Sequence, residues 1–237
     1  MGNLFFISAL ACPLIFSPVT SGDGTCNGYF PVKQGTTYEI SNYSPADKLT
    51  GTSKCSIESV ANAGDTTILS MLGNWYDTKG VQIFSTHFKL KCTGGLVLLN
   101  MEDMGLLDPK QTFTQKGSVT MRGDYLDIPG KPAPGEKLKN GTLIISHDGG
   151  RKKDTNRWVI TSKLSNRRME KKETVTTPAG TFSCIKITYD VSTYTIFDVK
   201  SHVAEWYALN TGMVRSERYS EDGQLQGYSV LTSIRGN

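Results

Sequence analysis

The chain holds few residue types in spacings that support catalysis. Its three histidines, His87, His147 and His202, are far apart, and no His-x-His or His-Glu-x-x-His pair would place two metal ligands on one face. No Gly-x-Ser-x-Gly elbow presents a serine nucleophile, and no glycine-rich loop could cradle a phosphate. The sequence therefore nominates no catalytic, metal-binding or cofactor-binding residue, and we expect a protein that is not an enzyme and needs no cofactor.

Two carboxylate pairs, Glu102 with Asp103 and Asp148 with Asp154, are of the kind that glycosidases use for acid and base catalysis. We interpret them as solvated loop residues, because nothing in the pattern brings either pair into a cleft. The alternative is a carbohydrate-active or hydrolytic accessory protein. In that case Trp158, Trp206 and Tyr207 would form an exposed aromatic platform for sugar.

The basic residues form two clusters, at residues 151–153 and at residues 167–172. Lys+Arg 26 against Asp+Glu 22 leaves a net charge of only +4, too mild and too evenly spread to indicate nucleic acid. Alternation along a strand divides the second cluster, including Arg167 and Arg168, between two faces. We therefore interpret both clusters as solvated surface or a protected strand edge.

Residues 1–21 carry no charged side chain, and their apolar run is too short to span a bilayer. We interpret them as a cleavable secretory signal peptide, with the mature chain free of any transmembrane span; the alternative is a lipoprotein acylated at Cys12. Removal of this segment leaves four of the five cysteines. In a periplasmic or secreted protein, that number predicts a structural disulfide involving Cys92 or Cys184. Buried free thiols are the alternative.

An alternation of apolar and polar residues recurs along the chain and predicts strands. Residues 81–92 show it well, because Phe84, Phe88 and Leu90 share one face while His87 and lysines share the other. Further strands are expected at residues 36–43, 52–60, 66–75, 118–128, 142–146, 157–164, 166–176, 181–193, 202–207, 213–219 and 224–234, separated by Gly, Asn and Asp turns. We predict an all-β fold: a curled antiparallel sheet, either a half-barrel or an open barrel, in a single domain of residues 22–237.

The apolar residues 96–99 are too few to classify by period, and residues 101–109 have the least strand-like pattern of the chain. We expect a short helix or an apolar loop there. Residues 96–107 could cover the apolar face of the sheet as a lid.

Several stretches resemble the TapB-like group of uncharacterised secreted or periplasmic bacterial proteins, which contain a domain of unknown function. The matching pieces are residues 28–40 (GYFPVKQGTTYEI), 48–51 (KLTG), 166–168 (NRR), 174–184 (TVTTPAGTFSC), 205–207 (EWY) and 211–217 (TGMVRSE). The resemblance implies an all-β envelope protein and transfers no catalytic residue. The closing hairpin pattern is also similar to the half-barrel sheets of periplasmic lipoprotein carriers, which implies a concave sheet lined by aromatic and aliphatic side chains.

These expectations define a hypothesis: an exported, non-catalytic envelope protein that binds an apolar or lipid-like ligand, or a protein partner, through its concave sheet. The candidate ligand-lining residues are Trp75, Phe84, Phe88, Met101, Met104, Leu106 and Tyr189. Each could equally be ordinary core. A further alternative is a subunit of an envelope assembly that docks through a sheet edge.

Overall fold

The computed structural model describes residues 28–103, 118–131, 133–149, 157–195 and 198–236. They form thirteen strands: β1 (Thr37–Tyr43), β2 (Leu49–Ala63), β3 (Thr66–Tyr76), β4 (Gln82–Thr93), β5 (Leu96–Asn100), β6 (Val119–Gly123), β7 (Tyr125–Pro129), β8 (Gly141–His147), β9 (Trp158–Thr177), β10 (Gly180–Tyr194), β11 (Asp198–Ala208), β12 (Gly212–Ser220) and β13 (Leu225–Arg235). No helix occurs among these residues.

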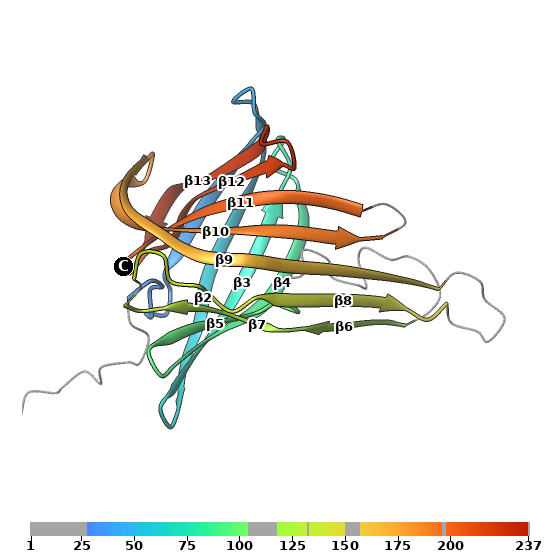
Figure 1. The fold of residues 1–237 in the computed structure, drawn as a ribbon. Coiled ribbons are helices and arrows are strands. Elements are labelled where there is room, and N and C mark those ends of the chain that lie inside the picture. The colour runs from blue at the N-terminus through green and yellow to red at the C-terminus, as the bar shows by residue number, and fades with distance from the viewer. Residues whose placement is uncertain (1–27, 104–117, 132, 150–156, 196–197, 237) are drawn as a thin grey trace, which may run out of the picture.

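All thirteen strands belong to one antiparallel sheet, in the order β6-β8-β9-β10-β11-β12-β13-β1-β2-β3-β4-β5-β7. The sheet curls around an interior, so that β2, β3 and β4 lie across from β9 and β10 (Figure 1). The predicted all-β fold with a curled antiparallel sheet is confirmed, and the curl goes nearly as far as a closed barrel.

One residue joins the two edges of the sheet. The edge strands β6 and β7 are separated only by Asp124, and they pair with β8 and β5, respectively. The Asp124 carbonyl accepts a hydrogen bond from the Met101 amide at 3.0 Å, at the end of β5. The Asp124 amide donates to the Thr142 carbonyl on β8, also at 3.0 Å. Asp124 thus connects the two edge strands and also hydrogen-bonds to the end of β5 and to β8, which brings the barrel close to closure.

Arg167 links β9 to β7 next to this junction. Its guanidinium donates to the Asp127 carboxylate at 2.8 Å, to the Asp127 carbonyl at 2.9 Å and to the Lys139 carbonyl. The preceding residue, Asn166, has a φ of 54°, and the register of β9 against β10 shifts there. The Arg167 side chain is only 4% exposed, whereas that of Arg168 is 60% exposed. The expectation of a solvated cluster therefore holds for Arg168. It is wrong for Arg167, because the bulge directs its side chain to the buried side of the sheet.

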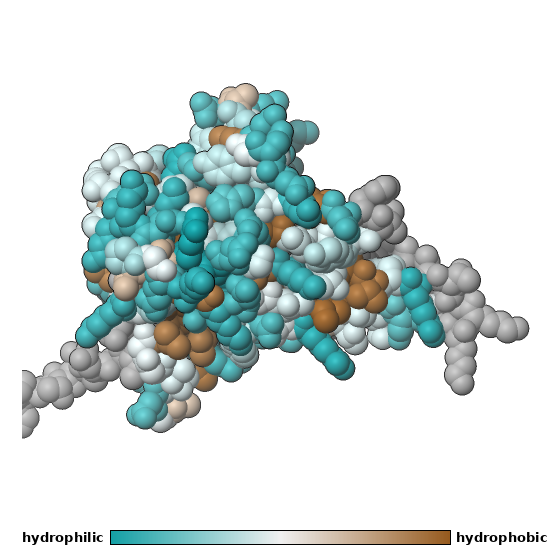
Figure 2. All heavy atoms as spheres, in the orientation of Figure 1, coloured by the Kyte–Doolittle hydropathy of each residue, from teal (hydrophilic) through white to brown (hydrophobic). Residues whose placement is uncertain are grey.

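The larger core fills the inside of the curl. Strand alternation supplies it, with Leu69 and Met71 from β3 and Ile187 and Tyr189 from β10. A smaller cluster that includes Trp206 and Val214 lies on the other face, where the bent β9–β10 hairpin contributes Val175 and Phe182. Both faces of β11 are therefore buried. The view in Figure 2 shows a largely hydrophilic surface with small separate apolar patches, as expected when the apolar side chains point inward.

Two expectations about elements need correction. Residues 96–100 are strand β5, which pairs with β4 and β7 inside the sheet, so this part of the chain is not a lid. A run of four apolar residues has no readable period, and its hydrogen-bonded pairing with the strands on either side decides that it is a strand. Residues 104–107 of the expected lid lie outside the described residues. The strands expected at 157–164 and 166–176 are one twenty-residue strand, β9, which continues through its bulge.

Candidate functional site

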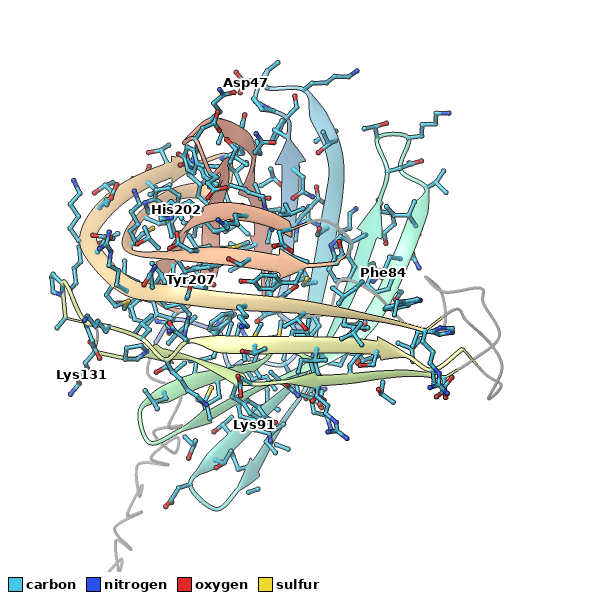
Figure 3. The ribbon with its side chains drawn as sticks, turned by 45° about the vertical axis from the view of Figure 1, so that its right-hand side comes forward. Asp47, Phe84, Lys91, Lys131, His202 and Tyr207 are labelled. Carbon is cyan, nitrogen blue, oxygen red and sulfur yellow. The ribbon has the colours of Figure 1, made fainter. Side chains whose placement is uncertain are left out.

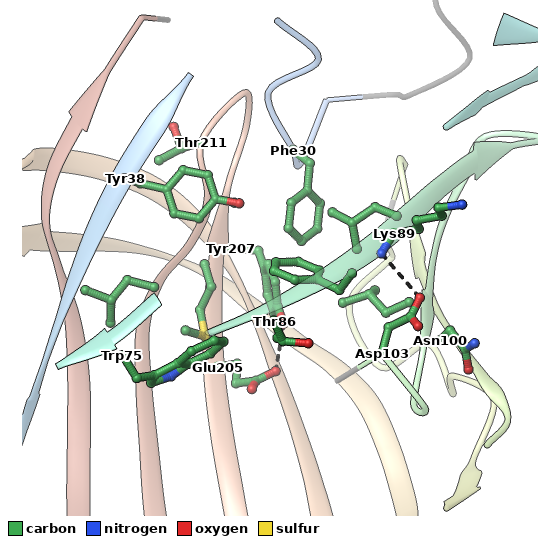
Figure 4. Close-up of a pocket in the computed structure, with 16 residues that line it drawn as sticks. Phe30, Tyr38, Trp75, Thr86, Lys89, Asn100, Asp103, Glu205, Tyr207 and Thr211 are labelled. Atoms are coloured by element: carbon green, nitrogen blue, oxygen red, sulfur yellow. Dashed lines mark hydrogen bonds between the residues drawn. The ribbon is translucent and has the colours of Figure 1, made fainter. Parts of the chain in front are cut away.

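A cavity of about 260 Å³ lies inside the curl of the sheet. Aromatic and aliphatic side chains form most of its wall, among them Tyr38 from β1, Trp75 from β3, Phe88 from β4, and Met213 from β12. Phe30, from the segment before β1, covers one side (Figure 4). The volume is slightly below the usual range of about 300–1,000 Å³ for small-molecule sites. It therefore suits a single short apolar chain.

Strand alternation explains which residues face this cavity. On β11, Glu205 and Tyr207 line the cavity, while Ala204 and Trp206 belong to the cluster on the opposite face. Figure 3 shows Tyr207 within the curve of the sheet and Lys131 at its periphery. Successive residues of a strand point to opposite faces, so this single strand contributes both to the cavity wall and to the second core.

Glu205 places a carboxylate in the apolar wall. Its Oε1 accepts a hydrogen bond from the Tyr189 hydroxyl at 2.9 Å, and its Oε2 accepts one from the Tyr207 hydroxyl at 2.8 Å. Burial raises the pKa of Glu205, while the two hydroxyls and the more distant charges of Arg167 and Arg218 act in the opposite direction. Burial also raises the pKa of both tyrosines well above the ordinary value. Glu205 thus places a hydrogen-bond acceptor within the apolar part of the wall, whereas the other carboxylate of the lining, Asp103, lies in the turn after β5.

The turn after β5 closes another side of the cavity. There the Asp103 carboxylate accepts a hydrogen bond from the Lys89 backbone amide at 3.2 Å (Figure 4). Its neighbour Glu102 accepts one from the Gly123 amide at 2.9 Å. The two carboxylates therefore hold the turn to β4 and β6, and they do not converge as an acid–base pair. In the other predicted pair, Asp148 binds the backbone and hydroxyl of Ser118, and Asp154 lies outside the described residues.

The predicted lining residues fall in different places. Trp75 and Phe88 line the cavity, and Phe84 packs against Trp75 with ring centroids 5.0 Å apart. Tyr189 lies at the polar end, where it binds Glu205, and Met101 is buried in the core. Met104 and Leu106 lie outside the described residues. That any of them contacts a ligand stays a prediction.

The expected aromatic sugar platform is wrong for two of its three members. Trp206 and Tyr207 are only 5% and 6% exposed, because β11 is covered on both faces. Trp158 stacks on His147, with ring centroids 5.4 Å apart. The three rings therefore form no shared exposed surface.

Sequence reasoning did not nominate Glu205 as a site residue, and it assigned Tyr207 to the wrong environment. The sequence does contain a usable signal. Val203, Glu205 and Tyr207 are two residues apart from one another, so in a strand Glu205 lies on the same face as two apolar residues. A carboxylate at such a position is rare in a core unless it has partners. That pattern alone would have nominated it.

The cysteines are divided between two states. Cys92 is disulfide-bonded, with its partner outside the described residues, whereas Cys55 and Cys184 are free thiols. A disulfide at Cys184 is therefore excluded, and one at Cys92 is present. Burial raises the pKa of both free thiols to about 11.

The described residues contain no group of three or more His, Cys, Asp or Glu side chains arranged to hold a metal ion. In the same part of the chain there is no helix with the length and apolar character required to cross a membrane.

Comparison with known proteins identifies a family and a shared fold. The profile of the DUF3108-like family matches residues 33–231. No curated protein matches the chain. A candidate lipoprotein from Parabacteroides distasonis ATCC 8503 superimposes with a TM-score of 0.73 at 21% identity, over 89% of this chain and 99% of that one; at this identity the likeness concerns the fold alone. A candidate exported protein with a YmcC-like fold from Bacteroides fragilis NCTC 9343 gives a TM-score of 0.73 at 28% identity, over 89% and 100% of the two chains. With most of its length inside the family match, the chain belongs to the DUF3108-like family.

Proposed function

We propose that this protein is a non-catalytic envelope protein that binds an apolar or lipid-like ligand inside its barrel. The observation that carries the proposal is the cavity of about 260 Å³, walled mainly by aromatic and aliphatic side chains, with the Glu205 carboxylate held in that wall by two tyrosine hydroxyls. An apolar space with a few fixed polar groups is the usual composition of a small-molecule site. Protein interiors otherwise contain few voids larger than a water molecule.

Localisation in the periplasm or outside the cell belongs to the same proposal. The uncharged segment of residues 1–21 supports it, as do the two similar structures, which are a candidate lipoprotein and a candidate exported protein. We further propose that, within the DUF3108-like family, the chain groups with the TapB-like proteins, and the motifs at residues 174–184 and 205–217 support this.

The test is a calorimetric binding titration of the purified protein with 1-octanol, an apolar chain of a size that the cavity of about 260 Å³ can hold. A separate sample is extracted with organic solvent, and mass spectrometry of the extract identifies any lipid that copurifies. A Met213→Trp variant fills the cavity from its wall. Ile83→Trp makes a comparable addition at a side chain that is 64% exposed and outside the cavity lining. Saturable binding that is lost in the first variant and kept in the second supports the proposal. Absence of binding, or equal binding by both variants, refutes it.

A further inference from the structure

The Glu205 carboxylate is unusual because no ion pair accompanies its burial. Among the described residues it forms no salt bridge, and its hydrogen bonds come from two neutral hydroxyls, those of Tyr189 and Tyr207. Its partners across the sheet are Ile187 on β10 and Ser216 on β12. Removing a carboxylate from water is costly unless its lone pairs are satisfied. The arrangement therefore leaves Glu205 short of partners on the side of the cavity.

The capacity of the carboxylate can be counted. A carboxylate offers about four lone-pair sites to donors. The two tyrosine hydroxyls occupy one on each oxygen. Glu205 also lines the cavity, so its remaining acceptor sites can be reached by a molecule within it. A ligand that donates a hydrogen bond there would replace a hydrogen bond with water that the Glu205 carboxylate loses on burial.

The surrounding charges limit what kind of donor fits. Burial is the largest influence on Glu205 and raises its pKa, and the hydrogen bonds from Tyr207 and Tyr189 and the charges of Arg167 and Arg218 oppose that rise without reversing it. A ligand carboxylate would place a second acidic group beside Glu205, and two carboxyl groups that share one site cannot both ionise without a penalty. A ligand ammonium would lose its water on entering the apolar cavity, a cost that attraction to a single carboxylate need not repay. A neutral donor avoids both penalties.

We propose that Glu205 selects ligands with a neutral hydrogen-bond-donating head group, such as a hydroxyl, and rejects those with a carboxylate head. This inference rests on the proposed function and names the chemistry of its ligand. At about 30 Å³ for each water-sized group, the cavity of about 260 Å³ holds a chain of about nine non-hydrogen atoms. An eight-carbon alcohol matches that size.

The experiment compares three ligands of one chain length, 1-octanol, octanoate and octylamine, each titrated into the protein by isothermal calorimetry at pH 7.5. We expect the wild-type protein to bind octanol at least about tenfold more tightly than octanoate or octylamine, the effect of one charge-assisted hydrogen bond. Glu205→Gln should weaken octanol binding by about tenfold and narrow its advantage over octanoate.

Glu217→Gln is the matched control. Glu217 on β12 also accepts a tyrosine hydroxyl, from Tyr219, but it pairs with Arg215 and does not line the cavity. It should leave the ranking of the probes unchanged. If Glu205→Gln does not fold, the ranking of the three probes on the wild-type protein is still decisive. Equal affinity for octanol and octanoate overturns the inference while the proposed function stands. Binding of none of the three ligands overturns both.

Discussion

Replacing Arg167 by alanine should destabilise the protein far more than the same change at the adjacent Arg168. The Arg167 side chain is 4% exposed, and it holds the Asp127 carboxylate and two backbone carbonyls across the closure of the barrel. Removing one partner of a buried ion pair costs about 3–5 kcal/mol. Asp127 remains 24% exposed and can regain some water, so we expect a loss near the lower end, about 3 kcal/mol.

Arg168 is the matched control because it has the same side chain one position along. It pairs with Glu170 at 2.6 Å but is 60% exposed, and exposed pairs contribute about 0–1 kcal/mol. For a chain of this size, a loss of 3 kcal/mol lowers Tm by about 6–12 °C. Urea unfolding followed by circular dichroism measures both variants. Equal destabilisation by Arg167→Ala and Arg168→Ala, or a loss below about 1 kcal/mol for Arg167→Ala, would refute the assignment of Arg167 as the link between β9 and β7.

Three other outcomes are expected. Burial raises the pKa of Cys55 and Cys184 to about 11, so only about one thiol in a thousand is ionised at pH 8. Iodoacetamide should therefore modify these thiols slowly in the folded protein and readily in guanidinium. Rapid labelling of the native state would contradict this. Gly123→Ala should cost about 1–3 kcal/mol in thermal unfolding, because its Cβ would lie 2.7 Å from the Glu102 backbone nitrogen; unchanged stability would show that the turn moves freely. Hydrogen bonds from His202 and then Asn166 lower the pKa of Asp190, so its contribution is present above the ordinary carboxyl pKa and is lost as the pH falls through the lowered one. The advantage of the wild type over Asp190→Asn in urea should therefore shrink as the pH falls below about 4, and a gap that widens there would contradict the assignment.

The inner face of the sheet could be predicted from the sequence because a strand has a side-chain period of two. That rule correctly places Phe88 with Leu90 on β4 and Ile187 with Tyr189 on β10. It requires only that each strand be regular and half-buried. Where those conditions hold, the prediction and the structure agree residue by residue.

The prediction fails where the strand is irregular or where pairing decides the outcome. Asn166 adopts a left-handed conformation, and the bulge there turns Arg167 into the wall, which no periodic pattern encodes. Residues 96–100 become β5 because β4 and β7 lie on either side, which is information from distant parts of the chain. Closure of the barrel through Asp124 also depends on distant parts of the chain, because Asp124 hydrogen-bonds to the backbone of Met101 and Thr142.

Glu205 and Glu217 show why a buried carboxylate in this barrel suggests a role beyond stability. Both accept a hydrogen bond from a tyrosine hydroxyl, but Glu217 also forms a salt bridge with Arg215. Glu205 interacts with Arg167 and Arg218 only at longer range, and Arg167 is bonded to Asp127. A valine stands two residues before Glu205 on the same face and is fully compatible with that core. If stability alone governed position 205, an apolar side chain would suffice there, because well-packed apolar groups often match or exceed buried polar ones. The proposed ligand supplies a reason for a carboxylate at position 205 that stability alone does not.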